Sequence, residues 1–330
     1  MVGKFKSIWK LLNIFLMLTL LSCTREVKVP VTSPEGEWEW VAKNTINIEA
    51  YVVFQAGGKA YLGLGKTGDA ENNAFYEFDE EGGWQPTQDI APFPGTGKRS
   101  ALALATGDKV YIGMEKNDTR LQDKDWWVYD LQTKVWSQLP YEFPGEARFG
   151  GNYGVVAKGN IYVTGSAQDF YELLPGEGWR RLADLPARMD EGGFWAIEDN
   201  IYAGGYSIDQ ETGNPTNHCF FRYLPEADRW ETIALKDAGA EKALQLHSPA
   251  SFTLRQGNKV YLYLVGNDSE TLSPVHSCWR YDIQLNEWAQ MEDFPEQCLE
   301  ASGFAIGNRG FVVASPGDAQ SLITWEYVAK

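Results

Sequence analysis

The chain is poor in the residues that most often mark a metal or nucleophilic site. It has 4 Cys and 3 His among 330 residues, and no two Cys are spaced as CxxC. A zinc knuckle therefore has no support. The sequence also lacks a Gly-rich phosphate loop, a GxSxG elbow and an HExxH pair. We predict no bound metal and no cofactor.

Basic residues are also scarce. There are 29 Lys and Arg against 45 Asp and Glu, a net charge of −16. Without residues 1–22, which carry three Lys and no acid, 26 basic residues face 45 acidic ones and the net charge is −19. A surface this negative repels phosphate backbones, so nucleic acid is excluded as a partner.

Long apolar runs are missing everywhere except at the start. "MVGKFKSIWK" carries Lys4, Lys6 and Lys10, "LLNIFLMLTLL" follows, and then Ser22 and Cys23. A basic start, a short apolar stretch and a small residue are typical of a secretory signal. "LLSC" resembles a bacterial lipobox, which implies a lipoprotein signal over residues 1–22, a lipid on Cys23 and a tether over 23–34. The protein would then be exported and anchored to the outer membrane, on its periplasmic or surface side. A simple cleaved signal is the alternative.

Three cysteines follow Cys23, namely Cys219, Cys278 and Cys298. In an exported protein, Cys219 and Cys278 are candidates for a disulfide. The alternative is three half-buried thiols that pack as small apolar residues.

Aromatic residues and glycine, by contrast, are abundant, with 13 Trp, 16 Tyr, 16 Phe and 33 Gly. A Tyr after a Gly-containing turn recurs, as in "GGKAYLGLG" and "KGNIYVTGS", and Phe311 takes its place in the last copy. The intervals between copies are 50, 51, 40, 59 and 50 residues. An aromatic strand leading to a lone Trp recurs independently, as in "WWVYDLQTKVW" and "CWRYDIQLNEW". Each unit therefore reads as four short strands, a to d, with the Tyr in b and the Trp in d.

This unit resembles a Kelch repeat, which has a period of about 50 residues. The resemblance implies an all-β, six-bladed Kelch-type β-propeller of four-stranded antiparallel blades over residues 35–330. The last unit ends at "ITWEYVAK", a strand c with no strand d after it, and "GEWEWVAKNTINI" near the start has the Trp of a strand d. We therefore expect the N-terminal strand to close the last blade and remove its open edge.

Basic residues recur in register where strand d crosses to the next strand a. Arg99 lies 12 residues before its Tyr, and Arg148, Arg188 and His247 lie 14 before theirs. The Kelch resemblance implies that such Arg side chains ring the channel mouth and receive an acidic or polar ligand. The alternative is that each Arg pairs with a nearby acid such as Glu146, Asp190 or Glu191.

The other two histidines, His218 and His276, each lie five residues before the Tyr of strand c. We expect them in b–c loops, which share a face with the d–a crossings. Together with His247 they suggest a metal site, but successive blades would hold them apart, so solvated loop histidines are the favoured interpretation.

Two functions fit these residues. The first is a monomeric binding module for a protein or glycan ligand at the channel mouth, attached to the membrane only through Cys23. The alternative is an enzyme similar to exported Kelch-type sialic-acid mutarotases or epimerases, which act on N-acetylneuraminate. The Arg side chains would hold the carboxylate, and His247 or Glu191 would move the proton. Galactose oxidase also has Kelch repeats, but no counterpart to its copper ligands is present, so oxidase activity is not predicted.

Overall fold

The computed structural model describes residues 36–115, 123–145, 153–165, 168–268, 276–316 and 321–330. The chain divides into two units, Met1–Val31 and Thr32–Lys330, and the first lies wholly outside these ranges. The predicted signal, tether and Cys23 therefore lie outside the described residues. Within the described ranges, no helix has the length and apolar content to cross a membrane.

The described residues form six four-stranded antiparallel sheets, which confirms the predicted blades. Blade I contains β2 (Val52–Ala56), β3 (Lys59–Gly63), β6 (Phe75–Asp79) and β7 (Gly83–Pro86). Blade II contains β8 (Leu102–Thr106), β9 (Lys109–Gly113), β10 (Trp126–Asp130) and β11 (Val135–Gln138). Blade III contains β12 (Gly154–Ala157), β13 (Asn160–Thr164), β14 (Phe170–Leu174) and β15 (Gly178–Arg181).

Blades IV and V have the longer strands. Blade IV contains β16 (Glu191–Ile197), β17 (Asn200–Ile208), β18 (Pro215–Leu224) and β19 (Arg229–Thr232). Blade V contains β20 (Leu246–Gln256), β21 (Lys259–Asp268), β22 (His276–Asp282) and β23 (Glu287–Gln290). Blade VI contains β24 (Cys298–Ile306), β25 (Arg309–Pro316), β26 (Leu322–Ala329) and β1 (Gly36–Asn44). Strands β4 (Lys66–Thr67) and β5 (Ala70–Glu71) form a small ribbon in the b–c connection of blade I.

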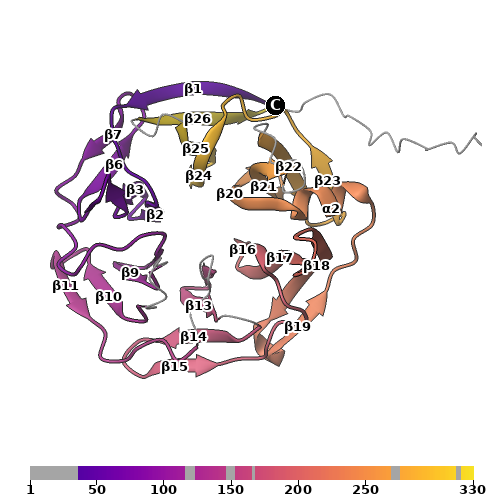
Figure 1. The fold of residues 1–330 in the computed structure, drawn as a ribbon, viewed down its shortest axis with the longest axis horizontal. Helices are drawn as coiled ribbons and strands as arrows, with labels where there is room; N and C mark the ends of the chain where they lie inside the picture. The colour runs from indigo at the N-terminus through magenta and orange to yellow at the C-terminus, as the bar shows by residue number, and fades with distance from the viewer. Residues whose placement is uncertain (1–35, 116–122, 146–152, 166–167, 269–275, 317–320) are drawn as a thin grey trace, which may run out of the picture. The chain divides into compact units, whose positions relative to one another are not determined.

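The sheets form a closed ring (Figure 1), in which the first strands of neighbouring blades contact one another in the order β2, β8, β12, β16, β20, β24 and back to β2. Strand β1 lies on the outside of blade VI, where it pairs with β26 from Gly36↔Ala329 to Asn44↔Leu322. This confirms that the N-terminal strand completes the last blade and covers the edge that β26 would otherwise expose.

The core lies between neighbouring blades, because each sheet has apolar side chains on both faces. One cluster, for example, joins Phe170 of blade III to Tyr223 and Trp230 of blade IV. The repeated Tyr and Trp belong to this core, as predicted. Tyr129 and Tyr281 are at most 1% exposed, and the paired aromatics pack edge to face or tilted.

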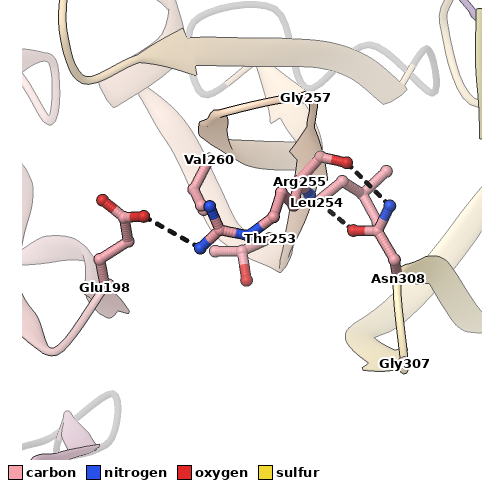
Figure 2. A pocket seen from close by; sticks show the side chains of 8 residues that line it. All are labelled: Glu198, Thr253, Leu254, Arg255, Gly257, Val260, Gly307 and Asn308. Carbon is pink, nitrogen blue, oxygen red and sulfur yellow. Dashed lines mark hydrogen bonds and ion pairs between the residues drawn. The ribbon is translucent and has the colours of Figure 1, made fainter.

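Hydrogen bonds also link blades at the a–b turns. The side-chain amide of Asn308 in blade VI accepts from the backbone N–H of Arg255 in blade V at 2.6 Å and donates to its carbonyl at 2.8 Å (Figure 2). The Arg255 guanidinium reaches the other way, to Glu198 of blade IV at 3.0 Å. Three consecutive blades are therefore tied together through one residue.

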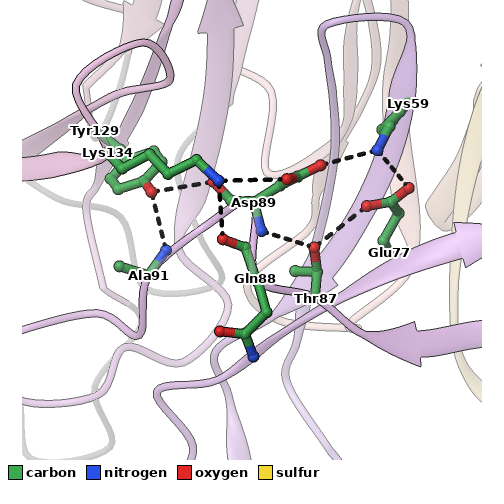
Figure 3. A network of polar contacts seen from close by, with 8 residues as sticks. All are labelled: Lys59, Glu77, Thr87, Gln88, Asp89, Ala91, Tyr129 and Lys134. Carbon is green, nitrogen blue, oxygen red and sulfur yellow. Dashed lines mark hydrogen bonds and ion pairs between the residues drawn. The ribbon is translucent and has the colours of Figure 1, made fainter.

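The repeated Tyr and Trp have a second role at the d–a crossings. The Tyr129 hydroxyl in blade II donates to the Asp89 carbonyl and accepts from the Ala91 N–H, both in the crossing from blade I (Figure 3). The Trp136 indole N–H donates to the Ala91 carbonyl at 2.9 Å. The Asp89 carboxylate also pairs with Lys59. Trp230 of blade IV makes the equivalent bond to the Ala183 carbonyl, so blades II and IV each hold the crossing that precedes them.

The predicted place of two histidines needs correction. His218 and His276 were expected in b–c loops as solvated side chains, but they lie in β18 and at the start of β22. Hairpins longer than the repeat predicts extend blades IV and V at this end, and His276 is only 3% exposed. The segment after Trp230 forms helix α2 (Ala238–Leu244), and the Asp237 carboxylate caps its N-terminus. A single 3₁₀ turn, η1 (Pro225–Ala227), joins β18 to β19.

The candidate disulfide between Cys219 and Cys278 is not formed. Cys219, Cys278 and Cys298 are all free and buried. Cys219 packs between blades III and IV, whereas Cys278 packs between blades V and VI, so a whole interblade layer separates them. They pack as small apolar residues in the core.

Candidate functional site

Two of the predicted residues, His247 and His276, line a pocket of about 490 Å³ at the face formed by the d–a crossings and b–c connections. We call this face the mouth face and this cavity the mouth pocket. Its lining comes from the first two and the last two blades: Glu49, Ala50, Lys66, Ser100, His247, Ser248, Val265, Gly266, Asn267, His276, Glu300, Ala301 and Ser315. His247 and His276 are therefore brought together, and Arg99 is the residue before Ser100.

Blade V supplies a row of three polar side chains to this pocket. Asn267 on β21 is the register partner of His247 on β20 and of His276 on β22. Register partners in an antiparallel sheet point to the same face, so the three side chains line up side by side. A β-bulge between His247 and Ala250 turns the start of β20 at this point.

A thiol lies behind the buried member of the row. The Sγ atom of Cys298 is 3.2 Å from Nε2 of His276. Burial raises the pKa of the Cys298 thiol to about 12, and the charges of Glu296 and Glu300 add to the rise. At neutral pH the sulfur is therefore a protonated thiol and a poor nucleophile.

The acidic lining residues belong to blades I and VI. The Glu300 carboxylate accepts from the Ala50 N–H at 2.9 Å and so joins blade VI to the entry of blade I. Burial, and then the charge of Glu300, raise the pKa of the neighbouring Tyr51 well above its ordinary value. Glu49 pairs with Lys66 at 3.0 Å. Both acids of the pocket lining are therefore engaged with neighbouring groups of the protein.

The described arginines of the predicted ring are both paired with acids. Arg99 reaches Glu71 of the β4–β5 ribbon at 3.1 Å. Arg188 reaches Asp190, one of the acids named as an alternative partner, at 2.6 Å. Neither lines the mouth pocket. Arg148 lies outside the described residues.

The predicted acid–base candidates touch one another. Nδ1 of His247 is 3.5 Å from a carboxylate oxygen of Glu191, the first residue of β16. The His247 side chain is 56% exposed and that of Glu191 only 17%. His218 lies beside the buried Tyr206, which is the register partner of Glu191, and does not line the pocket. Within the described ranges, no three His, Cys, Asp or Glu are grouped closely enough to hold a metal ion.

One residue at the mouth face was missed. Lys98, next to Arg99 in the same crossing, is 1% exposed, and its ammonium lies between Asp123, at 2.7 Å, and Asp125 of blade II. The signal was present in the sequence, because "DKD" at 123–125 falls in a b–c connection that the fold brings to the same face as the crossing. A buried ammonium with two carboxylates is a structural tie between crossing and blade.

A larger hollow of about 580 Å³ lies at the opposite end of the ring, among the a–b turns of blades IV, V and VI. Its polar side chains include Glu198, Arg255 and Asn308, which already bond to one another's blades (Figure 2). None of the predicted site residues that the structure describes lines this hollow. We therefore favour the mouth pocket as the functional site, since its polar groups are not all used to join blades.

Comparisons with known proteins agree with the fold. No family model matches the chain. It is 24% identical over 234 residues to Kelch-like protein 25 of Xenopus tropicalis, covering 66% of this chain and 36% of that protein. It is 26% identical over 112 residues to human Kelch domain-containing protein 1, covering 29% of this chain and 28% of that one. The matches therefore span only about a third of these relatives.

Among solved structures, the chain is similar to that of YjhT, with a TM-score of 0.63 and 12% identity over 86% of this chain and 95% of the other. At this identity the likeness concerns the fold alone. Together with the distant sequence similarity, it supports a six-bladed propeller of Kelch type.

Proposed function

We propose that this propeller is a binding module that receives a protein or glycan ligand in the mouth pocket. The observation that carries the proposal is the convergence of polar side chains from blades I, V and VI on one cavity of about 490 Å³. A cavity of this size is in the range of small-ligand sites, which combine apolar walls with a few polar groups. The distant similarity to Kelch proteins supports an interaction role.

Binding of glycans is tested by thermal shift and calorimetry with N-acetylneuraminate, N-acetylglucosamine and galactose. A ligand of the mouth pocket should stabilise the protein, and His247→Ala should abolish the stabilisation. Arg255→Ala at the opposite hollow is the matched control and should retain it. A protein ligand is tested with a photo-crosslinking amino acid at position 247, compared with position 158 on the other face. Equal crosslinking from both positions, with no sugar effect, would count against a mouth site.

The second candidate function is a mutarotase or epimerase for N-acetylneuraminate or a similar acidic sugar. The observation that favours it is the contact between His247 and Glu191, a histidine oriented by a carboxylate. Ring opening requires one group to take the proton of the anomeric hydroxyl while another gives a proton to the ring oxygen. Exchange of the anomers, followed by NMR saturation transfer, should then be faster with the protein and slower with Glu191→Gln. Rates equal to those of buffer would exclude the enzyme and leave binding intact.

We also propose that residues 1–22 direct export and that Cys23 carries a lipid anchor at the bacterial envelope, with the propeller a monomer. The basic and apolar start and the "LLSC" stretch support this proposal. Cys23→Ser should move the protein from the detergent phase to the aqueous phase in a Triton X-114 partition. A wild-type protein found in the aqueous phase would contradict the anchor.

A further inference from the structure

The charged side chains that line the mouth pocket are already engaged within the protein. Lys66, the one Lys or Arg among the described lining residues, pairs with Glu49 at 3.0 Å. Glu300 accepts a backbone N–H from the entry of blade I at 2.9 Å. Nδ1 of His247 lies 3.5 Å from the Glu191 carboxylate. A charged ligand group would have to compete with these contacts, so we looked for recognition among the neutral side chains of the lining.

Two serines of the lining hold a backbone conformation that suits glycine better. Ser100, just before β8, has a φ of 45°, and Ser248, in the bulge at the start of β20, has a φ of 41°. A left-handed φ costs a non-glycine residue free energy that glycine would avoid. The cost is greater for Ser248 because Pro249 follows, and the residue before a proline prefers extended backbone. Both positions therefore keep a hydroxyl in the pocket at a cost to the folded state.

Asn267 is a third neutral group that is costly in the free protein. Its Oδ1 atom is buried and accepts no hydrogen bond from any residue that the structure describes. Asn267 on β21 is the register partner of His247, the residue before Ser248, so the amide lies beside the bulge that carries the serine. A buried acceptor without a donor costs free energy, which a ligand O–H or N–H can recover on binding. Two hydroxyls and one amide thus line the same cavity.

These three side chains suit a ligand that is rich in hydroxyl groups. A serine hydroxyl both donates and accepts, and the asparagine amide does the same through its two terminal atoms. A sugar ring carries hydroxyls on neighbouring carbons, and each of them also donates and accepts without a charge. A carboxylate only accepts, so it offers no donor to Oδ1 of Asn267. The cavity of about 490 Å³ is in the range of small-ligand sites.

We propose that the mouth pocket binds an uncharged sugar through its hydroxyl groups, with Ser100, Ser248 and the Asn267 amide as the contacts that determine specificity. This inference rests on the proposed binding function and names the class of its ligand. The sugar is either free or the terminal unit of a larger glycan, since both present the same hydroxyls. Each of the three residues then has a cost in the free protein and a contact in the complex.

The test compares neutral sugars with their acidic counterparts by calorimetry at low and at physiological salt. The pairs are glucose with glucuronate, galactose with galacturonate, and mannose with mannuronate. In the pair whose hydroxyls match the pocket, the neutral sugar should bind more tightly than the acid, and its affinity should not change with salt. A neutral disaccharide that ends in the same sugar separates the two sources: retained binding identifies a glycan end, and lost binding identifies the free sugar.

Variants of the three residues should separate affinity from stability. Ser100→Gly, Ser248→Gly and Asn267→Ala each remove one neutral contact and should weaken sugar binding by about three- to tenfold. None should lower the midpoint of thermal unfolding, because glycine relieves the left-handed φ and alanine removes the buried acceptor. Lys158→Gly is the matched control, since Lys158 has a φ of 50° in an a–b turn at the opposite end of the ring. It should leave sugar binding unchanged.

Three results would overturn the inference. Tighter binding of an acidic sugar, weakening as salt rises, would do so and leave a glycan-binding function standing. Binding of a neutral sugar that the three pocket variants leave unchanged would place the sugar elsewhere. No response from any sugar would overturn the inference together with the glycan form of the proposed function, whereas crosslinking of a protein from position 247 would still support the protein-ligand form.

Discussion

Two tryptophans on one strand provide the sharpest test of how the ring is closed. Trp38 and Trp40 both lie in β1, the N-terminal strand that completes blade VI. Trp38 packs edge to face on Phe294 and Tyr327, each with ring centroids 5.0 Å away, and its indole N–H donates to the Glu292 carbonyl at 3.0 Å. Trp40 is 58% exposed. Alanine at these positions removes the same atoms from different surroundings.

The two substitutions should lower the free energy of unfolding by amounts that differ several-fold. Burying a whole Trp side chain removes about 150–250 Å² from water, worth roughly 4–6 kcal/mol at about 25 cal/mol per Å². Trp38 is only partly buried, so we expect Trp38→Ala to lower the free energy of unfolding by about 3 kcal/mol, including about 1 kcal/mol for its hydrogen bond. Trp40→Ala should cost about 1 kcal/mol or less, because more than half of its side chain is already in water.

Urea denaturation followed by fluorescence and by far-UV circular dichroism measures both variants. The shift in midpoint should be large for Trp38→Ala and small for Trp40→Ala, with a similar slope. Deletion of residues 35–46 should be more severe than either, since it exposes the whole edge of β26. Equal and small effects of the two substitutions would refute the argument that β1 is packed into the last blade.

The other predictions concern single contacts. Asn308→Ala should lower the unfolding free energy by about 1–2 kcal/mol, since it leaves both backbone groups of Arg255 without their partner, and thermal denaturation measures this. The described cysteines should not react with a maleimide in the native protein at pH 8, because burial raises the pKa of Cys298 to about 12 and the thiol stays protonated; rapid labelling before denaturation would contradict this. Burial alone would raise the pKa of Asp282, but Lys259 and two backbone N–H groups bring it below the ordinary value, so its stabilising effect should be lost as pH falls below about 4. Asp282→Asn should therefore lower stability at pH 7 and reduce its loss on acidification.

The architecture was predictable because two independent anchors repeat with the blade. A Tyr in strand b and a Trp in strand d do not recur together over most of the chain by chance. Both side chains recur because they pack in the core between neighbouring blades. Trp136 shows why the spacing is physical, since its indole N–H holds the crossing that precedes its own blade. The unmatched half-repeats at the two ends, around Trp38 and Trp325, made closure by the N-terminal strand predictable as well.

Features that the repeat pattern does not specify, such as hairpin length and side-chain direction, could not be predicted from the sequence. His276 was expected in a loop because the repeat gives only the position of the following Tyr281, and the length of a hairpin beyond it depends on local pairing. Cys219 lies four residues before Tyr223 but Cys278 only three before Tyr281, and the two thiols face different interblade layers. Side-chain direction alternates along a strand, so one residue of displacement changes which layer receives the thiol.

The Arg residues that recur in the d–a crossings show the same limit of prediction at the candidate site. Recurrence in the crossings correctly brings Arg99 and Arg188 to the mouth face, but the charge that a ligand meets depends on partners from other segments. Glu71 comes from a ribbon in blade I, and Asp190 lies two residues beyond Arg188. The basic residues recur at the same position of each repeat, whereas their acidic partners do not. The sequence therefore reveals the cations but not the acids that pair with them. The charge that a ligand meets at the mouth face is therefore set by both groups of residues, of which the repeat reveals only the cations.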